Sequence, residues 1–160
     1  MSAIVIMGVC GTGKTDIGTG VAAALAARFV EGDDLHSDAN RAKMGRGEPL
    51  TDADRWPWLE RAGQELATGT VVLACSALRR VYRDRIRQYA GGPVMFVHLT
   101  GARETIAARM AARTDHYMPP VLLDSQLALL EVPEPDEQCI NVDVSGSAAS
   151  VLAEVLKALT

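Results

Sequence analysis

The segment GVCGTGKT at Gly8–Thr15 decides the fold that this sequence predicts. It matches G-x-x-x-x-G-K-[ST], the pattern of a phosphate-binding loop. The apolar run Ala3–Met7 leads into the segment, and an alanine-rich run from Lys14 to Ala27 follows it. The pattern therefore lies between a predicted strand and a predicted helix, as its mechanism requires, which separates it from a glycine-rich turn with a surface lysine.

The residue types of this loop indicate how it binds a nucleotide. Glycines permit a backbone that points several N–H groups at phosphate oxygens, and a helix that begins near Gly13 adds its positive N-terminal end. Lys14 supplies a point charge at the β- and γ-phosphates, and the Thr15 hydroxyl is expected to bind Mg²⁺. The predicted nucleotide-binding residues of the loop are Gly8, Gly11, Thr12, Gly13, Lys14 and Thr15.

Outside the loop, short apolar runs alternate with longer helical patterns, which is typical of a parallel sheet with crossover helices. The predicted strands are Ala3–Met7, Arg28–Glu31, Thr70–Cys75, Val94–Leu99 and Cys139–Val144. The predicted helices are Lys14–Ala27, Thr51–Ala67 with Thr51 and Asp54 as a capping box, Arg79–Tyr89, Ala102–Arg113, Pro120–Leu130 and Ser147–Leu159. With 160 residues, the chain is expected to form one three-layer α/β domain around a mainly parallel five-stranded sheet.

Composition narrows the class of partner and the compartment. The chain is 48% hydrophobic and 22% charged, as in soluble globular proteins, and its formal net charge of -4 gives no general attraction for nucleic acid or an anionic membrane. Cys10, Cys75 and Cys139 have neither disulfide-framework nor zinc spacing, which fits a reducing compartment. The apolar run at the N-terminus is too short for a signal peptide, so we expect a cytoplasmic protein.

A phosphate-binding loop does not distinguish a hydrolytic switch from a kinase. The chain has no N-K-x-D motif for guanine, which weakens the interpretation as a switch. The predicted strand Thr70–Cys75 ends without an acidic residue, so a carboxylate for Mg²⁺ must come from elsewhere. The segment Glu31–Asp34 follows another predicted strand and should lie at the carboxyl edge of the sheet, where ligands bind. An acidic turn before a helix, capped by Asp34 or Ser37, is the alternative.

With these residues in view, the chain resembles bacterial-type gluconokinases, members of the shikimate-kinase-like branch of the P-loop nucleoside-monophosphate-kinase fold. The resemblance covers nearly the whole chain. Its motifs are GVCGTGKT, EGDDLH at Glu31–His36, the run from Asn40 to Leu59, CSALRRVYRDRIR at Cys75–Arg87 and HYMPPVLLDSQLALLE at His116–Glu131. The resemblance implies ATP-dependent phosphorylation of D-gluconate to 6-phosphogluconate by a cytoplasmic homodimer. A kinase for shikimate or another small hydroxy acid, and a non-catalytic nucleotide-binding module, are the alternatives.

The resemblance also implies roles for individual residues. Glu31 aligns with a family carboxylate that holds Mg²⁺ through water, although the family more often has Asp there. Asp33 aligns with the carboxylate that accepts the proton of the attacking hydroxyl or orients that hydroxyl. A sugar acid calls for fork-shaped cations, and Arg55 and Arg80 are the predicted residues for its carboxylate. An ion pair of Arg55 with a neighbouring acid, Asp52 or Glu60, is the alternative for that residue.

Further candidates lie around the acceptor. Ser76 follows a predicted strand and is expected to present its hydroxyl or backbone to the substrate, unless it caps the next helix. His36 is expected to hydrogen-bond the sugar acid, or else to have a structural role. Trp56 and Trp58 are expected to anchor their helix in the core rather than to stack on a base.

The last candidates belong to a predicted lid. Arg109 and Arg113 are four residues apart on one helix and run into a segment that the family uses as a lid, at about 113–123. Closure is expected to bring both guanidinium groups to the transferred phosphoryl group and to exclude water, unless both are ordinary surface arginines. A second segment, at about 37–68, is expected to cover the substrate. The loop Ser145–Ala148 matches the place where related kinases hold adenine.

Overall fold

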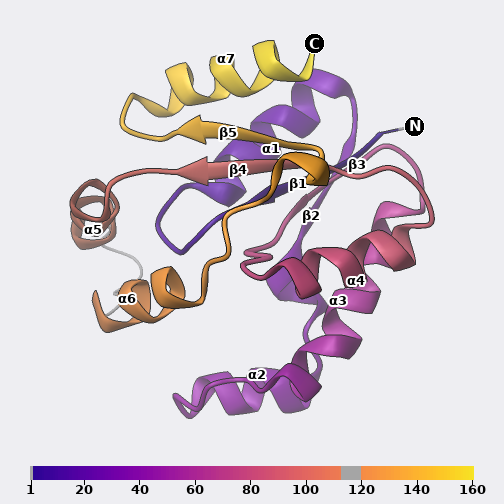
Figure 1. The fold of residues 1–160 in the computed structure, drawn as a ribbon, viewed down its shortest axis with the longest axis vertical. Helices are drawn as coiled ribbons and strands as arrows, with labels where there is room; N and C mark the ends of the chain where they lie inside the picture. Colours follow the sequence, from indigo (N-terminus) through magenta and orange to yellow (C-terminus); the bar gives the residue numbers. More distant parts are fainter. Residues whose placement is uncertain (1, 113–119) are drawn as a thin grey trace.

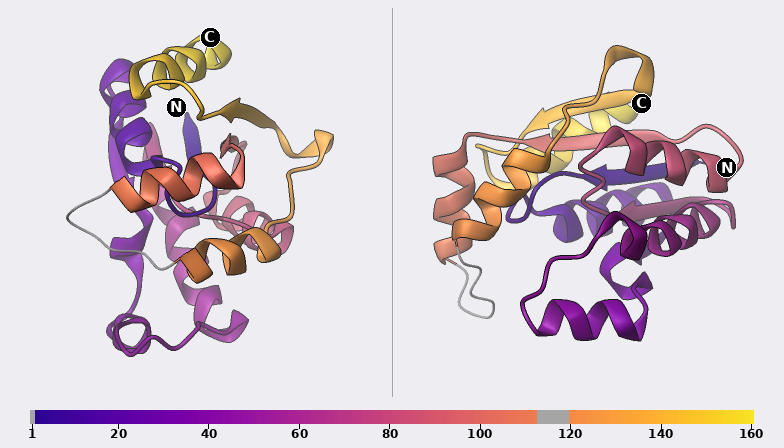
Figure 2. Two further views of the ribbon diagram at one scale, coloured as in Figure 1. Left: turned by 90° about the vertical axis from the view of Figure 1, so that its left-hand side faces the viewer. Right: turned by 60° about the horizontal axis from the view of Figure 1, so that its bottom comes forward.

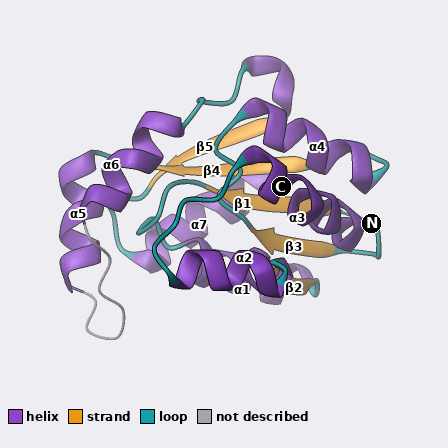
Figure 3. Ribbon diagram, turned by 90° about the horizontal axis from the view of Figure 1, so that it is seen from below, coloured by secondary structure: helices purple, strands orange, loops and turns teal. Residues whose placement is uncertain are grey.

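The structure is a computed structural model that describes residues 2–112 and 120–160. A five-stranded sheet, in which every strand pairs in parallel, forms its centre, in the order β2-β3-β1-β4-β5 (Figures 1 and 3). The strands are β1 Ala3–Met7, β2 Arg28–Glu31, β3 Val71–Ala74, β4 Met95–Thr100 and β5 Cys139–Asp143. The helices are α1 Lys14–Leu25, α2 Asp38–Gly45, α3 Asp52–Leu66, α4 Arg80–Ala90, α5 Arg103–Ala112, α6 Pro120–Leu129 and α7 Ala148–Leu159, with short 3-10 turns η1 Gly32–Leu35 and η2 Pro135–Glu137.

The sheet is covered on both faces, which explains why its strands read as continuous apolar runs. Helices α1 and α7 lie on one face, and α3 and α4 lie on the other (Figure 1). Successive side chains of β1 alternate between the two layers: Ile4 and Ile6 join the core under α1 and α7, whereas Val5 and Met7 join the core under α3 and α4. The central strand is thus fixed from both sides, and the loop that follows it starts from a rigid base.

Two helices lie beyond the carboxyl ends of the strands rather than on a face of the sheet. Figure 2 shows α5 and α6 in front of this edge, with α2 standing apart from the sheet. A third, smaller core joins Val9 and Cys10 of the phosphate-binding loop to Ile106 and Met110 of α5 and to Leu123 of α6. The helices around this edge are therefore packed directly against the loop.

The expected architecture is confirmed, with the sheet wholly rather than mainly parallel. Thr51 and Asp54 form the predicted capping box at the start of α3. Helix α1 ends at Leu25, two residues before the predicted end, because Ala26 adopts the left-handed conformation at φ 52°. Within the described residues, no helix combines the length and apolar character needed to cross a lipid bilayer.

An ion pair is buried between α4 and the segment before β5. Arg83, which is 0% exposed, donates from Nε to Glu137 Oε1 at 2.7 Å and from Nη2 to Glu137 Oε2 at 3.2 Å. The same guanidinium donates to the carbonyl oxygens of Ala77 and Glu131 at 2.8 and 2.9 Å. Burial would raise the pKa of Glu137, but hydrogen bonds from Arg83, Glu134 and Arg87 hold it at about 2. One side chain thus ties α4 to the loop after β3 and to the connection between α6 and β5.

Glu137→Gln is expected to lower the free energy of unfolding by about 3 kcal/mol, because it leaves the Arg83 guanidinium buried without a counter-charge. Urea denaturation at neutral pH measures this loss. Asp136→Asn is the matched control, since Asp136 is the neighbouring residue but its carboxylate is exposed and pairs with Arg80 at the surface. The control should change stability by less than about 1 kcal/mol. Equal losses for both variants would contradict a special role for the buried pair.

Candidate active site

The phosphate-binding loop needs glycine for two separate reasons. Gly8 has φ +149°, and a Cβ there would lie 2.7 Å from the carbonyl oxygen of Leu99. Gly13 caps the N-terminus of α1 at φ 88°, in the left-handed region. Thr12 is buried and donates its hydroxyl to the Val9 carbonyl at 2.9 Å, which braces the loop from within. The backbone and the helix N-terminus together form a cradle for an anion.

Lys14 lies inside this cradle and is half-buried. Its ammonium donates to the Val9 carbonyl oxygen at 3.0 Å. Burial lowers the pKa of Lys14, and the nearby charges of Asp33 and Glu31 are among those that oppose this shift. The loop lysine and the acidic segment therefore face the same space.

The two residues predicted to bind a metal are in direct contact. Thr15 Oγ1 donates to Glu31 Oε2 at 2.5 Å, which brings a hydroxyl and a carboxylate together beside the loop. The described residues contain no group of three or more His, Cys, Asp or Glu that could hold a metal by themselves. This set fits Mg²⁺, which is usually bound by one or two protein oxygens, waters and substrate phosphates.

The acidic turn η1 is fixed against the end of β3 and against α3. A Cβ on Gly32 would collide with the Ala74 carbonyl oxygen, and Trp58 Nε1 donates to the Gly32 carbonyl at 2.8 Å. Asp33 follows in the chain and is exposed. Because β3 lies between β1 and β2, and neighbouring strands are ~4.8 Å apart, the backbones of β1 and β2 lie about 10 Å apart where the loop and the turn begin.

His36 packs beside this turn. Its ring stacks on Trp58 with centroids 4.2 Å apart, and its Nδ1 lies 3.2 Å from Asn40 Nδ2. Burial lowers the pKa of His36, the charge of Asp33 raises it, and Arg41 and Arg55 lower it further. His36 is therefore buried and fixed in position. It is close enough to Asp33 and Arg55, two residues predicted to contact the acceptor, for their charges to act on its ring. The expected anchoring role of Trp58 is confirmed by its burial.

Two arginines converge near the start of α3 and α4. Arg55 Nη1 lies 3.2 Å from Asp52 Oδ1, and Arg79 Nη1 lies 3.2 Å from Asp52 Oδ2. Both guanidinium groups lie over the Tyr82 ring, 5.4 and 5.5 Å from its centroid. The alternative for Arg55, an ion pair with Asp52, is therefore formed, whereas Glu60 pairs with Arg85. We call Asp52, Arg55, Arg79 and Tyr82 the arginine cluster.

The structure brings Arg79, and not the predicted Arg80, to this cluster. Arg80 forms a two-pronged ion pair with Asp136, at 3.0 and 2.7 Å, on the other side of the helix start. Arg79 is the N-cap of α4 and has extended backbone angles, whereas Arg80 is the first helical residue and points elsewhere. Sequence reasoning missed Arg79 because the direction of two adjacent arginines depends on which of them starts the helix.

Ser76 lies where β3 leaves the sheet, next to the phosphate-binding loop. Its carbonyl oxygen accepts from Gly8 N at 3.3 Å. The alternative for Ser76, a helix cap, is wrong, because Arg79 is the N-cap of α4 and the Glu131 carboxylate accepts from Arg80 N at 2.9 Å. Ser76 is therefore adjacent to the loop and carries no capping role.

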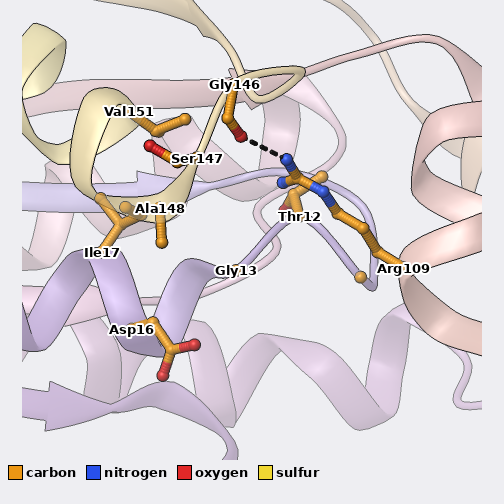
Figure 4. A pocket seen from close by; sticks show the side chains of 10 residues that line it. Thr12, Gly13, Asp16, Ile17, Arg109, Gly146, Ser147, Ala148 and Val151 are labelled. Carbon is orange, nitrogen blue, oxygen red and sulfur yellow. Dashed lines mark hydrogen bonds between the residues drawn. The ribbon is translucent and has the colours of Figure 1, made fainter. Parts of the chain in front are cut away.

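A cavity of about 550 Å³ opens on the α1 and α7 side of the loop (Figure 4). Arg109 reaches across it from α5 and donates to the Gly146 carbonyl at 2.7 Å. The predicted adenine loop thus borders the same cavity as the phosphate-binding loop. Arg113 lies outside the described residues, as do His116 and Tyr117. The lining residues are Gly11, Thr12, Gly13, Asp16, Ile17, Arg109, Gly146, Ser147, Ala148 and Val151.

Comparison with known proteins agrees with this geometry. No protein-family model matches the sequence. A gluconokinase of Gluconobacter oxydans (strain 621H) is 46% identical over 159 residues, which cover 96% of this chain and 89% of the relative. The crystal structure of a gluconokinase from Sinorhizobium meliloti 1021 is 44% identical with a TM-score of 0.86, over 99% of this chain and 95% of that one.

A more distant likeness defines the fold. A shikimate kinase from Bacteroides thetaiotaomicron has a TM-score of 0.69 at 16% identity, over 99% of this chain and 98% of that one. At this identity the likeness concerns the fold alone. The high identity to curated relatives over nearly the whole chain decides the family, and the chain belongs to the gluconokinases.

Proposed function

We propose that this protein transfers the γ-phosphoryl group of ATP to the O6 hydroxyl of D-gluconate and so forms 6-phospho-D-gluconate. The observation that carries the proposal is that the loop lysine Lys14 and the exposed carboxylate Asp33 face one space at the carboxyl edge of the sheet. Membership of the gluconokinase family supports gluconate as the acceptor. Shikimate is not favoured, because the likeness to shikimate kinase extends only to the fold.

On the donor side, the loop N–H groups and the N-terminus of α1 bind the phosphates. When ATP binds, the Lys14 ammonium gives up its hydrogen bond to the Val9 carbonyl oxygen and donates to phosphate oxygens instead. This change places the positive charge of Lys14 at the γ-phosphate. Adenine is proposed to enter the cavity between the apolar side chains of Ile17 and Val151 and the Gly146–Ala148 backbone. Arg109 already lies at the edge of this cavity and is proposed to turn from Gly146 to the phosphates.

Mg²⁺ is proposed to be held by Thr15 and, through water, by Glu31. When bound, the ion would supply positive charge that offsets the negative charge of the phosphates during transfer. The contact between Thr15 and Glu31 supports this assignment, because a hydroxyl and a carboxylate are already paired where the phosphates bind. Glu31, although longer than the Asp usual in the family, reaches the threonine directly.

On the acceptor side, Asp33 is proposed to orient the O6 hydroxyl and to accept its proton. In a loose phosphoryl-transfer transition state, holding the hydroxyl in line contributes more than removing its proton early. Arg55 and Arg79 are proposed to bind the carboxylate, with Arg79 in place of the predicted Arg80. His36 and Ser76 are proposed to bind acceptor hydroxyl groups, because they flank Asp33 and the loop.

Closure and assembly complete the proposal. We propose that the chain is a single domain in which residues of about 37–68 cover the acceptor and residues of about 113–123, with Arg113, close as a lid. A closed lid excludes water and so limits hydrolysis of ATP. The family resemblance supports a cytoplasmic protein that forms a homodimer. Size-exclusion chromatography with light scattering tests the dimer.

An acceptor panel tests the function directly. We expect ADP formation with gluconate and Mg²⁺, and only background formation with shikimate, glucose, AMP or no acceptor. Glucose lacks a carboxylate for the arginine cluster, and the likeness to shikimate kinase is limited to the fold, whereas the similar gluconokinases support gluconate. A coupled assay for ADP measures each rate, and ³¹P NMR identifies the product. Binding of ATP without turnover on any acceptor would support a non-catalytic module and overturn the proposal.

Two substitutions distinguish the residue proposed to bind ATP from the residue proposed to act on the acceptor hydroxyl. Lys14→Ala should raise the KM for ATP and lower kcat, because it removes the charge at the phosphates. Asp33→Asn should lower kcat by about 10² or more and leave ATP affinity nearly unchanged, since it removes the proton acceptor but no donor contact. Steady-state kinetics and calorimetric titration with a non-hydrolysable ATP analogue measure these effects.

Asp34→Asn is the control for Asp33→Asn, because it removes the adjacent exposed carboxylate of the same turn. Its kcat should stay within about twofold of the unchanged protein. If Asp33→Asn kept full turnover while Asp34→Asn lost it, the roles of the two carboxylates would have to be exchanged.

The choice between the two adjacent arginines is tested in the same way. Arg79→Gln should raise the KM for gluconate by about tenfold, because it removes a charged hydrogen-bonding group from the cluster. Arg80→Gln should change this KM by less than about twofold, because Arg80 pairs with Asp136 away from the cluster. The reverse result would restore Arg80 as the acid-binding residue.

A further inference from the structure

The hydroxyl of Tyr82 is used both as a donor and as an acceptor within the arginine cluster. It donates to Asp52 Oδ1 at 2.6 Å and accepts from Arg55 Nη1 at 3.0 Å. The side chain is 3% exposed, so its position is set by packing between α3 and α4. The ring also forms the surface over which the guanidinium groups of Arg55 and Arg79 lie. One buried tyrosine therefore touches every other member of the cluster.

Asp52 joins the two arginines through different oxygens. Oδ1 pairs with Arg55 and Oδ2 with Arg79, each at 3.2 Å. The hydrogen bond from Tyr82, followed by the charges of the arginines, lowers the pKa of Asp52, so the carboxylate stays ionised at neutral pH. A single negative charge thus holds together two positive groups that would otherwise repel each other.

The bonds of the cluster leave one side of each guanidinium open. All side-chain hydrogen bonds that Arg55 makes to described residues use Nη1. Arg79 uses Nη1 for Asp52 and directs Nε towards Glu131 at 3.5 Å. Within the part of the chain that the structure describes, Nη2 of both arginines has no hydrogen-bond partner. In Arg55 the Nε and Nη2 groups are both left, and such a parallel pair of N–H groups matches the geometry of a carboxylate, whereas Arg79 adds its Nη2 group.

The cluster is connected to the turn that carries Asp33. Arg55 precedes Trp58 by three residues on α3, about one helical turn, and so lies on the same side of the helix. Trp58 donates to Gly32 in the turn and stacks on His36. The charges of Asp33 and Arg55 both act on the His36 ring. Trp58 and His36 therefore link the helix that carries Arg55 to the turn that carries the proposed catalytic carboxylate.

We propose that Asp52 and Tyr82 are positioning residues that hold Arg55 and Arg79 as one preformed receptor for the carboxylate of the acceptor. This inference rests on the proposed function and deepens it, because it names the residues that determine selectivity for an acid. Long arginine side chains lose rotamer freedom when they bind a ligand, and a receptor that is already ordered avoids much of that loss. Neither positioning residue needs to touch the acceptor.

Tyr82→Phe tests the inference with the least change in packing. It removes the hydroxyl and keeps the ring under both guanidinium groups. We expect the KM for gluconate to rise by about tenfold, with kcat and the KM for ATP within about twofold, because only the order of the acid receptor is lost. Tyr89→Phe on the same helix is the matched control and should leave all three constants unchanged. Thermal unfolding confirms that each variant is folded.

A second arm tests whether Tyr82 acts through Arg55. In an Arg55→Gln background, Tyr82→Phe should lower kcat/KM for gluconate by less than about twofold further. The arginine that the hydroxyl contacts is already gone, and phenylalanine keeps the ring under Arg79. Asp52→Asn should reproduce the selective rise in KM, and Asp84→Asn, which removes an exposed arginine-paired carboxylate of α4, should not.

Each outcome decides the inference. An unchanged KM for gluconate in both Tyr82→Phe and Asp52→Asn overturns the inference. A fully additive loss of kcat/KM when Tyr82→Phe is made in the Arg55→Gln background also overturns it, because such a loss indicates that Tyr82 only joins α3 to α4. The unchanged protein is measured first with gluconate. If it does not phosphorylate gluconate, the proposed function fails and the inference fails with it, whereas normal turnover combined with unaffected variants removes the inference alone.

Discussion

Parallel strands all end at one edge of their sheet, and every group of the candidate site depends on this constraint. Strand β1 delivers the phosphate-binding loop there, β2 delivers the acidic turn, and β3 separates the two while ending in the loop that holds Ser76. The gap between donor and acceptor is therefore set by the spacing of strands rather than by flexible side chains. The glycines at Gly8 and Gly32 allow both segments to approach the neighbouring backbone closely enough to use that gap.

The site gathers opposite charges in a chain whose net charge is negative. The charges of Glu31 and Asp33 act on Lys14, and the charges of Asp33 and Arg55 act on His36. Both substrates of the proposed reaction are anions, so each needs its own local group of cations, whereas the attacking hydroxyl needs a base between them. Charged groups of both signs at one edge suit the proposed transfer of a phosphoryl group from an anionic nucleotide to a hydroxyl group of an anionic acceptor.

Local signals were sufficient to predict most of the fold, including the bounds of β1 and β2 and the capping box of α3. These features depend on apolar runs, glycines and motif spacing within a few residues. The arginine cluster was only half predicted. Arg55 was identified from its motif, but the choice between Arg79 and Arg80 depends on where α4 begins, and the part of Tyr82 depends on the packing of α4 against α3, which no local pattern contains.

The buried Arg83 has a consequence for the way the chain is made. Its carboxylate partner, Glu137, is 54 residues further along the sequence, and one of its carbonyl partners belongs to Glu131. A ribosome-bound chain that has just completed α4 therefore carries a guanidinium that no later segment yet neutralises. The Arg83 guanidinium stays hydrated until the segment from Glu131 to Glu137 has been synthesised and has packed against α4. The loop that carries Ser76 and Arg79 consequently reaches its final shape only after that later segment has joined the fold.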